Sequence, residues 1–340
     1  MNDAASEKPL NMAYLLNNTG AVVIGRNEGE RLQICLRSLI TKLDKVVYVD
    51  SGSTDTSVDF AKGLGLHVIE LDLSTPFTAA RARNEGFKFI TTQYPKLLFV
   101  QFIDGDCELV SSWLNIATHF LYEHPNYAVV CGRRQERYPE RSIYNQLCDM
   151  EWDTLIGDAD ACGGDALIRV SSFSDAGGYN NLLIAGEEPE LCFRLRQLGW
   201  KIYRLDQNMT LHDAAMNHFR QWWMRSVRSG HAFAESMSIY GDKEKYLFKE
   251  TRSIFFWAGL LPILIIILSL FNTSFMMLFV AYPLQIGRMF LRNDKKYESY
   301  NLRFYYSFFV LLARFPQIVG AIKFYCSTIN RNQSSIIEYK

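Results

Sequence analysis

The chain has 340 residues, and its 36 basic and 36 acidic side chains cancel to a formal charge of zero. Because no net positive field surrounds such a chain, composition does not indicate a nucleic-acid partner. The length allows one large domain with an appendage, or two domains. The seven cysteines include no Cys-x-x-Cys pair, which favours reduced, mostly buried thiols in a cytosolic protein.

The N-terminus, Met1–Pro9, is polar and lacks a basic segment followed by an apolar core. We therefore expect no signal peptide and a flexible segment over residues 1–18.

Short apolar runs then alternate with helical patterns. Three runs are typical of buried strands, and apolar residues at helical spacing fill the intervals between them. The expected elements are a strand at Ala21–Gly25, a helix from Leu32 to Leu39, a strand at Lys45–Val49, a helix at Thr56–Leu64 and a strand at His67–Leu71. This alternation predicts a parallel sheet with right-handed crossovers.

A polar turn, Asp50-Ser51-Gly52-Ser53-Thr54-Asp55, follows the second of these strands and leads into a helix. Its hydroxyl and amide groups can hold the ribose and base edge of a nucleotide, and the helix N-terminus favours a nearby anion. Ser53 or Asp55 can equally cap the helix. The turn is not a P-loop and lacks the spaced glycines of a dinucleotide fingerprint.

Arg81 and Arg83 lie in the stretch Ala79–Gly86, which we expect to be helical. Residues two apart on a helix point in different directions, so at most one of these arginines should reach the end of the next strand. A solvated arginine is the alternative interpretation.

That next strand, Leu97–Ile103, ends on two carboxylates, Asp104 and Asp106, with Gly105 between them. At the C-terminal end of a strand, such carboxylates can point into the crevice where open α/β sheets bind ligands. Gly105 allows the backbone to approach a phosphate or metal closely, and carboxylate oxygens suit Mg²⁺ or Mn²⁺. An ordinary Asp-Gly turn is the simpler alternative.

Four segments occur in the order and spacing of family 2 glycosyltransferases, which the chain resembles over residues 20–215: Arg26-Asn27-Glu28, Asp50–Asp55, Ala80–Gly86 and Asp104-Gly105-Asp106. The resemblance implies a GT-A nucleotide-diphospho-sugar transferase fold, with a mixed, mainly parallel sheet flanked by helices. It also implies that Asp104 faces the ribose and diphosphate, and that Asp106 ligates Mn²⁺ or Mg²⁺ with Asp104 as a second candidate ligand. The other residues that it implies at the nucleotide-sugar site are Gly25, Arg26, Asn27, Glu28, Asp50, Ser53, Arg83, Gly105 and Gly164.

Two glutamates, Glu187 and Glu188, precede Pro189 at the start of an expected helix that ends before Gly199. The helix dipole favours their ionised forms, and an ionised carboxylate can act as the general base of an inverting transfer. Favourable charge in a first helical turn needs no catalytic role. The resembling family usually has Glu-Asp here and uses the aspartate as base, so by position the base would be Glu188.

A further strand is expected at Lys201–Leu205, and His212 follows it after a short gap. His212 resembles a histidine that completes the metal site in some GT-A enzymes. An imidazole ligand would favour Mn²⁺ over Mg²⁺. A surface histidine is the alternative.

The composition changes after residue 218. Residues 219–252 are basic and aromatic and are expected to form an interfacial helical linker. Ser253–Gly287 contains no charged residue, and as one helix it would be about 50 Å long, too long for a hydrocarbon core of about 30 Å. We therefore expect a membrane hairpin with arms at 254–271 and 275–290, within a membrane-associated region at 253–325. A buried pair of soluble helices is the alternative.

Basic residues flank this hairpin, so its ends should face the cytoplasm. These residues are Lys243, Lys245, Lys249 and Arg252 before it, and Arg288, Arg292, Lys295 and Lys296 after it. A third apolar stretch at 302–322 contains Arg303 and Arg314, which favours an interfacial or re-entrant segment over a third span. Residues 326–340 form the expected tail.

The sequence therefore predicts a divalent-metal-dependent, inverting glycosyltransferase at the cytoplasmic membrane, with its GT-A catalytic domain at residues 19–218 facing the cytoplasm. The expected donor is a UDP-sugar, and the expected acceptor is lipid-linked or a growing polysaccharide. A sugar-phosphate nucleotidyltransferase and a non-catalytic membrane scaffold are the alternatives.

Overall fold

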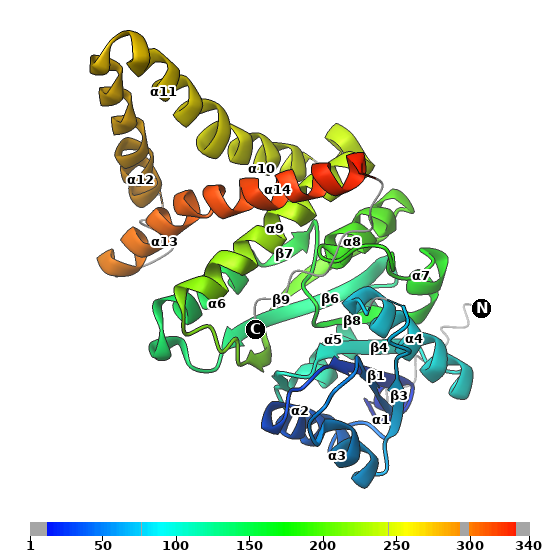
Figure 1. The fold of residues 1–340 in the computed structure, drawn as a ribbon. Coiled ribbons are helices and arrows are strands. Elements are labelled where there is room, and N and C mark those ends of the chain that lie inside the picture. The colour runs from blue at the N-terminus through cyan, green and yellow to red at the C-terminus, as the bar shows by residue number, and fades with distance from the viewer. Residues whose placement is uncertain (1–11, 76, 244, 293–298, 331–340) are drawn as a thin grey trace, which may run out of the picture. The chain divides into compact units, whose positions relative to one another are not determined.

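We describe a computed structural model of the chain (Figure 1), in which residues 12–75, 77–243, 245–292 and 299–330 are described. Residues 1–11 of the expected flexible N-terminus at 1–18, residues 331–340 of the expected tail at 326–340, and Lys295 and Lys296 lie outside the described residues. Met12–Asn17 is not a flexible segment but a helix with Leu15 buried, and α14 continues to Ile329.

The chain folds into two compact units that exchange segments. The sheet unit runs up to Arg137 and continues in Asp153–Asn180 and Glu188–Asp213. The helical unit contains Tyr138–Trp152, Asn181–Glu187 and the chain from Ala214 onward. The sheet unit thus ends at Asp213, whereas we expected its boundary at residue 218. Two segments that lie within its range of sequence, Tyr138–Trp152 and Asn181–Glu187, belong to the helical unit.

The sheet unit is built on one mixed sheet with the strand order β3-β2-β1-β4-β8-β6-β9-β5, and β7 pairs with β9. Strands β3, β2, β1 and β4 are parallel, whereas β8 lies antiparallel between β4 and β6. The strands are β1 Thr19–Gly25, β2 Val46–Asp50, β3 His67–Glu70, β4 Phe99–Asp104, β5 Cys107–Leu109, β6 Tyr127–Glu136, β7 Gly157–Ala159, β8 Ala166–Arg169 and β9 Lys201–His212.

The central strands β1 and β4 are buried along almost their whole length, which explains their uninterrupted apolar sequences. Helices of the sheet unit cover both faces of the sheet (Figure 1). They are α1 Met12–Asn17, α2 Glu30–Ile40, α3 Ser57–Gly63, α4 Ala79–Gln93, α5 Trp113–Glu123, α7 Val170–Asp175 and α8 Glu187–Gln197. The mixed α/β fold class predicted from the sequence is confirmed.

One strand differs from its prediction. We expected Lys201–Leu205 and then a gap before His212, because Asp206, Gln207 and Asn208 are all polar. Instead, β9 continues through these exposed residues and ends on His212. Its pairing with β6 shifts register on both sides of Arg133, and these bulges carry the ladder past the polar stretch.

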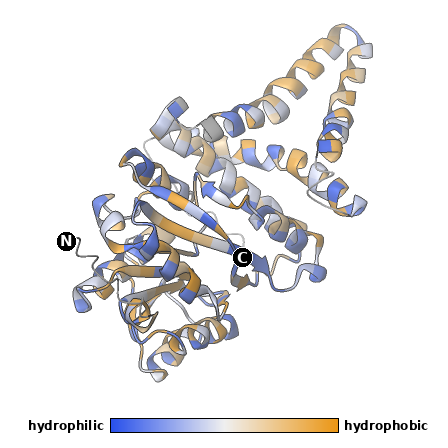
Figure 2. Cartoon of the chain, turned by 180° about the vertical axis from the view of Figure 1, so that it is seen from behind, coloured by the Kyte–Doolittle hydropathy of each residue, from blue (hydrophilic) through white to orange (hydrophobic). Residues whose placement is uncertain are grey.

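The helical unit contains η1 Pro139–Arg141, α6 Ile143–Trp152, α9 Phe219–Tyr240, η2 Gly241–Lys243, α10 Lys245–Phe255, η3 Phe256–Leu260, α11 Leu261–Phe271, η4 Thr273–Val280, α12 Ala281–Arg292, α13 Tyr300–Leu312 and α14 Arg314–Ile329. Three helices are long and apolar enough to cross a membrane: Phe248–Phe271, Thr273–Arg292 and Tyr300–Ile329. The first two form the expected hairpin, whose strongly apolar surface is visible in Figure 2.

The helix α4 packs directly on the sheet through Gly86. A Cβ atom at this position would lie 2.4 Å from Cγ1 of Val22 on β1 and 3.0 Å from Cγ2 of Val49 on β2. Such distances leave no room for a side chain, so the helix and sheet would have to separate.

We expect Gly86→Ala to lower the free energy of unfolding by about 1–3 kcal/mol, because it overpacks this contact. Gly63→Ala on α3 is the matched control, since nothing lies within 4 Å of the added methyl group. The control should be neutral or stabilising by up to about 1 kcal/mol through helix propensity. Urea unfolding of the detergent-solubilised protein would measure both changes, and equal effects would contradict the packing argument.

Candidate active site

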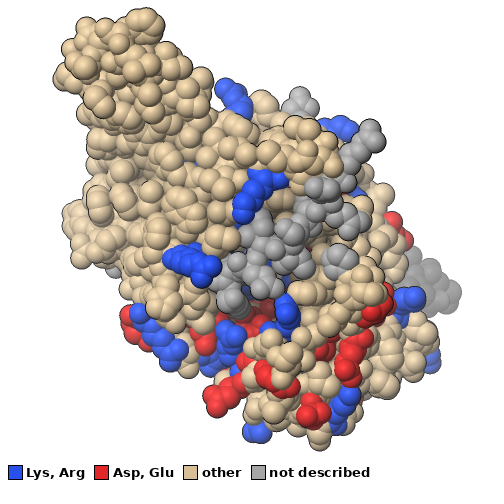
Figure 3. Space-filling model, viewed as in Figure 1, with Lys and Arg blue, Asp and Glu red and all other residues tan. Residues whose placement is uncertain are grey.

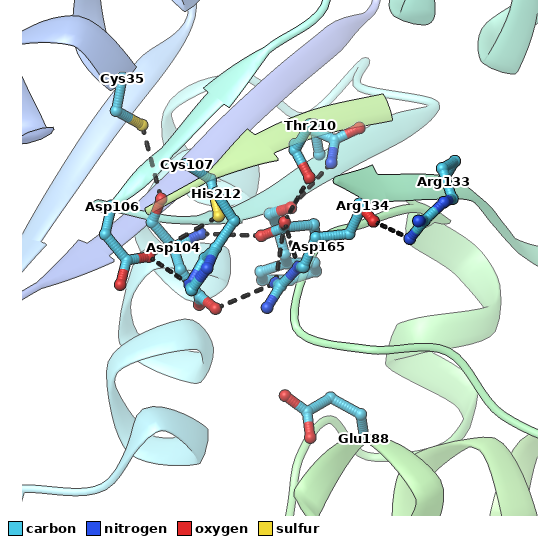
Figure 4. Close-up of polar contacts among 12 residues, drawn as sticks. Cys35, Asp104, Asp106, Cys107, Arg133, Arg134, Asp165, Glu188, Thr210 and His212 are labelled. Atoms are coloured by element: carbon cyan, nitrogen blue, oxygen red, sulfur yellow. Dashed lines mark hydrogen bonds and ion pairs between the residues drawn. The ribbon is translucent and has the colours of Figure 1, made fainter. Parts of the chain in front are cut away.

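The carboxyl ends of β1 and β4 meet where the strand order changes direction. From β1 the chain adds β2 and β3 on one side and later β4 on the other. In open α/β sheets, ligands bind outside the strand ends at such a switch point. Asp104 is the last residue of β4 and pairs with Ile24 of β1, so it lies at this point. Asp106, Asp165 and His212 gather beside it in Figure 4.

Arg83 on α4 connects Asp104 to Glu188. Its Nη2 lies 2.8 Å from Asp104 Oδ1, and its Nη1 lies 3.0 Å from Glu188 Oε1. The Arg83 side chain is buried, with 3% exposed, whereas 16% of the Glu188 side chain remains exposed. A rigid, forked guanidinium suits a bridge between two carboxylates. Arg83 thereby brings the candidate base next to the carboxylate at the end of β4.

Arg81 points elsewhere. It donates from Nη1 to the carbonyl oxygens of Asp72 and Thr75, each at 2.9 Å. Since side chains two residues apart on a helix do not share a face, α4 contributes only Arg83 to the strand end.

Glu188 lies in the first turn of α8, where Figure 4 shows its carboxylate directed toward the cluster. Glu187 begins the same helix and is buried, with 4% of its surface exposed. The partial exposure of Glu188 leaves it able to meet an incoming molecule.

Two glycines allow close packing at the site, Gly164 against Arg83 and Gly105 against the end of β1. A Cβ atom on Gly164 would lie 2.4 Å from Arg83 Nη2, 2.9 Å from Asp104 Oδ2 and 3.1 Å from Glu188 Oε1. The Gly105 N–H donates to the carbonyl oxygen of Ile24 at 2.8 Å, and a Cβ atom there would lie 3.1 Å from that oxygen. Both residues belong to the nucleotide-sugar set implied by the sequence.

A second arginine, Arg134 on β6, holds Asp104 from another side. Its Nη2 lies 3.2 Å from Asp104 Oδ2 and 2.8 Å from Asp165 Oδ2. The Asp165 carboxylate is fully buried and also accepts hydrogen bonds from the Thr210 hydroxyl at 2.8 Å and the Asp104 N–H at 3.0 Å. A buried polar network with these partners holds both the backbone and the side chain of Asp104 in place.

These charges control the ionisation of Asp104. Burial opposes its ionisation, but the positive charges of Arg83 and Arg134 outweigh burial and lower the pKa of the Asp104 carboxyl. Because the folded-state pKa is depressed, this group stabilises the fold above its unfolded pKa, and that contribution is lost as pH falls through the folded value.

Asp106 and His212 form the pair best suited to a divalent cation. His212 Nε2 lies 3.2 Å from Asp106 Oδ1, and both side chains are buried. Cys107 Sγ lies 3.6 Å from the same oxygen, so the three groups are close enough to share an ion. Burial raises the pKa of the Cys107 thiol well above its ordinary value when no metal is bound, and Mn²⁺ and Mg²⁺ prefer carboxylate or imidazole ligands to a thiol.

The protonation of His212 fits such a site. Burial alone would lower the pKa of His212, but Asp106 and Glu136 raise it above its ordinary value. This acidic surrounding favours positive charge beside Asp106, and a metal ion would replace the proton on the imidazole. A second group, Asp104 with Cys107 and Asp165, fits less well because both of its carboxylates already face arginines.

Asp50 organises the polar turn after β2 from the inside. It is 2% exposed, and its two oxygens accept hydrogen bonds from the hydroxyls of Tyr48 and Ser53 and from the N–H groups of Gly52 and Ser53. Burial, aided by Asp50, raises the pKa of Tyr48 far above its ordinary range, so this hydroxyl remains a donor. The Asp50 carboxylate is therefore already surrounded by donors from its own loop.

The loop after β1 binds this turn. The Asn27 N–H donates to Ser53 Oγ at 2.9 Å, and Asn27 Oδ1 accepts from the Thr54 N–H at 2.7 Å. Asn27 has a φ of 56°, a left-handed conformation that asparagine tolerates better than most residues. The two loops that were predicted to hold a nucleotide thus form one joined surface.

The remaining predicted residues lie on the same loop. Gly25 ends β1, the Arg26 guanidinium lies 4.5 Å from the ring centre of Phe77, and Glu28 forms an ion pair with Arg31 at 2.7 Å.

Sequence reasoning gave no role to Arg134, Asp165 or Thr210. Asp165 directly follows Gly164, which the resemblance implies at the site, so its position offered a signal. Arg134 and Thr210 offered none, because their roles depend on the bulged pairing of β6 with β9.

We expect Asp165→Ala to lower the free energy of unfolding by about 3 kcal/mol, since it leaves Arg134 without its closest carboxylate. Asp44→Ala is the control, because Asp44 is exposed and makes no side-chain contact of this kind in the described part of the chain. The control should cost about 1 kcal/mol or less. Denaturant unfolding would compare the two variants, and similar losses would show that the buried network is not a major source of stability.

Comparisons with known proteins show which chains resemble this one. Residues 21–175 match the glycosyl transferase family 2 model. The pre-mycofactocin glycosyltransferase of Mycobacterium tuberculosis is 27% identical over 238 residues, covering 65% of this chain and 49% of the relative. The chain thus spans about half the length of the curated relatives it matches.

The fold is also found in a solved structure. The mannosyltransferase PcManGT of Pyrobaculum calidifontis, solved with GDP-Man and Mn²⁺, superposes with a TM-score of 0.57 at 15% identity. The superposition covers 91% of this chain and 87% of the neighbour. The chain therefore has the GT-A fold, and residues 21–175, slightly less than half of its length, are similar to family 2 glycosyltransferases.

Proposed function

We propose that the protein is an inverting, metal-dependent glycosyltransferase that moves a sugar from a nucleotide-diphospho-sugar to a hydroxyl group of a lipid-linked or polysaccharide acceptor. The observation that carries the proposal is the Arg83 bridge, with contacts of 2.8 Å to Asp104 and 3.0 Å to Glu188. One buried side chain thereby links the strand end that would hold the donor to the carboxylate that would activate the acceptor.

Glu188 is the proposed general base. Its carboxylate would take the proton of the acceptor hydroxyl as that oxygen attacks the anomeric carbon. The bond between the anomeric carbon and the diphosphate breaks on the opposite side, so the configuration inverts. The partial exposure of Glu188 supports this role, since the base must touch a second substrate.

Asp106 and His212 are the proposed metal ligands. A bound Mn²⁺ or Mg²⁺ supplies positive charge that neutralises the leaving diphosphate. The imidazole favours Mn²⁺, which PcManGT contains. Asp104 is proposed to face the ribose and diphosphate, because its own oxygens lie against Arg83 and Arg134.

The joined loops after β1 and β2 are proposed to hold the nucleotide. We propose a UDP-sugar as donor. GDP is the second candidate, because PcManGT binds GDP-Man. Asp50 supports this surface through its bonds to Gly52 and Ser53.

The proposed location is the cytoplasmic membrane, with the sheet unit on the cytoplasmic side. The apolar helices of the helical unit support membrane association, and such association would favour a lipid-linked or membrane-bound glycan as acceptor. The family match counts against the two alternatives left open by the sequence, a nucleotidyltransferase and a non-catalytic scaffold.

We expect Glu188→Gln to lower kcat by about 10²- to 10⁴-fold, because the amide cannot accept the acceptor proton. Gln keeps the length of Glu and can still accept a hydrogen bond from Arg83, so donor binding should persist. Glu187→Gln is the matched control and should retain most activity. Steady-state transfer assays with UDP-sugars would decide, and loss of activity in the control alone would move the base to Glu187.

We expect calorimetric titration with UDP to show binding that requires Mn²⁺ and is lost in Asp106→Ala. Asp59→Ala, on the exposed side of α3, is the control and should bind as the unmodified protein does. Binding of GDP in place of UDP would change the donor and keep the mechanism. No binding of any nucleotide would contradict the proposed function.

A further inference from the structure

We infer that the helices α13 and α14, which together form Tyr300–Ile329, lie along the membrane surface and do not cross it. Among the described residues, only the hairpin Phe248–Arg292 would then cross the membrane. The inference rests on the membrane association proposed above and extends it to a topology. It concerns the helical unit alone and is independent of the donor and acceptor.

The first observation is a close crossing of α14 with α9. A Cβ atom on Gly230 of α9 would lie 2.0 Å from the carbonyl oxygen of Gln317, and one on Gly320 of α14 would lie 1.9 Å from the carbonyl oxygen of Val227. Each glycine thus admits the backbone of the other helix. Such contacts require the two helices to lie at the same depth.

The contact between the two segments extends well beyond the glycines. Phe309 of α13 lies against Trp222 at the start of α9, with ring centres 5.0 Å apart. At the other end, Ala234 of α9 packs with Ala321 and Phe324 of α14. Residues 309–324 therefore follow α9 for about 22 Å at the usual helical rise.

The helix α9, against which α14 packs, is unsuited to the interior of a bilayer. Arg225 of α9 pairs with Glu151 of α6 at 2.6 Å, and Arg228 donates to the carbonyl oxygen of Ile184 at 3.0 Å. If α13 and α14 crossed the membrane with α9 still attached, these charged groups would enter hydrocarbon, where charge is expensive. Crossing would thus require that the α9 contact be broken.

The inner face of α14 is itself polar. Arg314 forms an ion pair with Glu250 of α10 at 2.7 Å, and Gln317 Nε2 donates to Ser229 Oγ of α9 at 3.3 Å. In a membrane span these groups would lie near the middle of the segment. On the surface, they attach the helix to its neighbours.

The outer face has the opposite character. Phe304, Phe308, Val319, Ile322, Tyr325 and Ile329 are all exposed. Phe304 and Phe308 are four residues apart on α13, and Val319, Ile322, Tyr325 and Ile329 are three or four residues apart on α14, so that the second set shares one side of its helix, whereas Gln317 and Gly320 of α14 are buried. A long helix with one packed polar face and one apolar, aromatic face suits the headgroup boundary of a lipid bilayer.

The hairpin lacks this asymmetry. Among the described residues of η4 and α12 none is buried, in contrast to Pro316, Gln317, Gly320, Ala321 and Phe324 of α14. The projecting end of the hairpin carries no charged side chain on the face shown in Figure 3. The exposed apolar residues of α13 and α14 belong to the same unit as this uncharged hairpin, and so the bilayer is their expected occupant.

Thiol labelling of the full chain in sealed membrane vesicles would test the topology. Cys326 is the exposed cysteine, so Cys326→Ser provides the background for single reporters at exposed positions. Thr92→Cys marks the side of the sheet unit, Ser274→Cys marks the hairpin tip, and Asn330→Cys marks the end of α14. A membrane-impermeant maleimide would be added before and after detergent.

We expect Asn330→Cys to react together with Thr92→Cys in intact vesicles, and Ser274→Cys to react only after detergent. If Asn330→Cys instead reacts only with Ser274→Cys, α14 crosses the bilayer and the inference is wrong. If all three react in intact vesicles, the hairpin does not cross and the membrane part fails. Nucleotide binding, measured separately, would be untouched by either result.

A second measurement tests the contact on which the inference depends. In membranes, the double variant Ala234→Cys/Ala321→Cys should form an intramolecular disulfide on mild oxidation, because these residues pack together. Each single variant is the control and should retain a free thiol. Absence of the cross-link in folded, nucleotide-binding protein would show that α14 leaves α9 in the membrane.

Discussion

The placement of Asp104 between two arginines is the constraint on which the rest of the site depends. Arg83 comes from α4 and Arg134 from β6, while Asp165 precedes β8 and Glu188 lies in the first turn of α8. Three carboxylates thus share two guanidinium groups. Removing any one of these groups would take an opposite charge away from at least one buried partner. The sheet order has a direct chemical consequence, because β8 and β6 are the strands that bring Asp165 and Arg134 to the end of β4.

The parts of this site that could be read from the sequence are those with a local signal. An apolar strand that ends on Asp104-Gly105-Asp106 is visible in one segment, as is the polar turn from Asp50 to Asp55. Arg134 and Thr210 could not be found this way, because nothing in their neighbourhoods shows that a bulged pairing of β6 and β9 aligns them with Asp165. For the same reason β9 was expected to end at Leu205. Pairing with the distant strand β6 extends β9 through polar residues whose local sequence predicts the end of a strand.

In the helical unit, too, composition alone does not distinguish helices that have different surroundings. Hydropathy and length alone place Tyr300–Ile329 with the two arms of the hairpin. The surroundings differ, since α14 buries a polar face against α9 and α10 while α12 buries nothing among its described residues. Arg303 and Arg314 already pointed to an interfacial segment in the sequence. The glycines at 230 and 320 add the physical reason, because they let two backbones touch.

Gly164 has one further consequence. It is not among the glycines with positive φ, so its backbone does not require glycine, yet a Cβ atom there would lie 2.4 Å from Arg83 Nη2. Position 164 therefore requires glycine for a steric reason, because the Arg83 side chain occupies the space that a Cβ atom would need. In related chains, a larger residue at position 164 should accompany a shorter cation at position 83. The two positions should thus vary together in evolution, although 81 residues separate them.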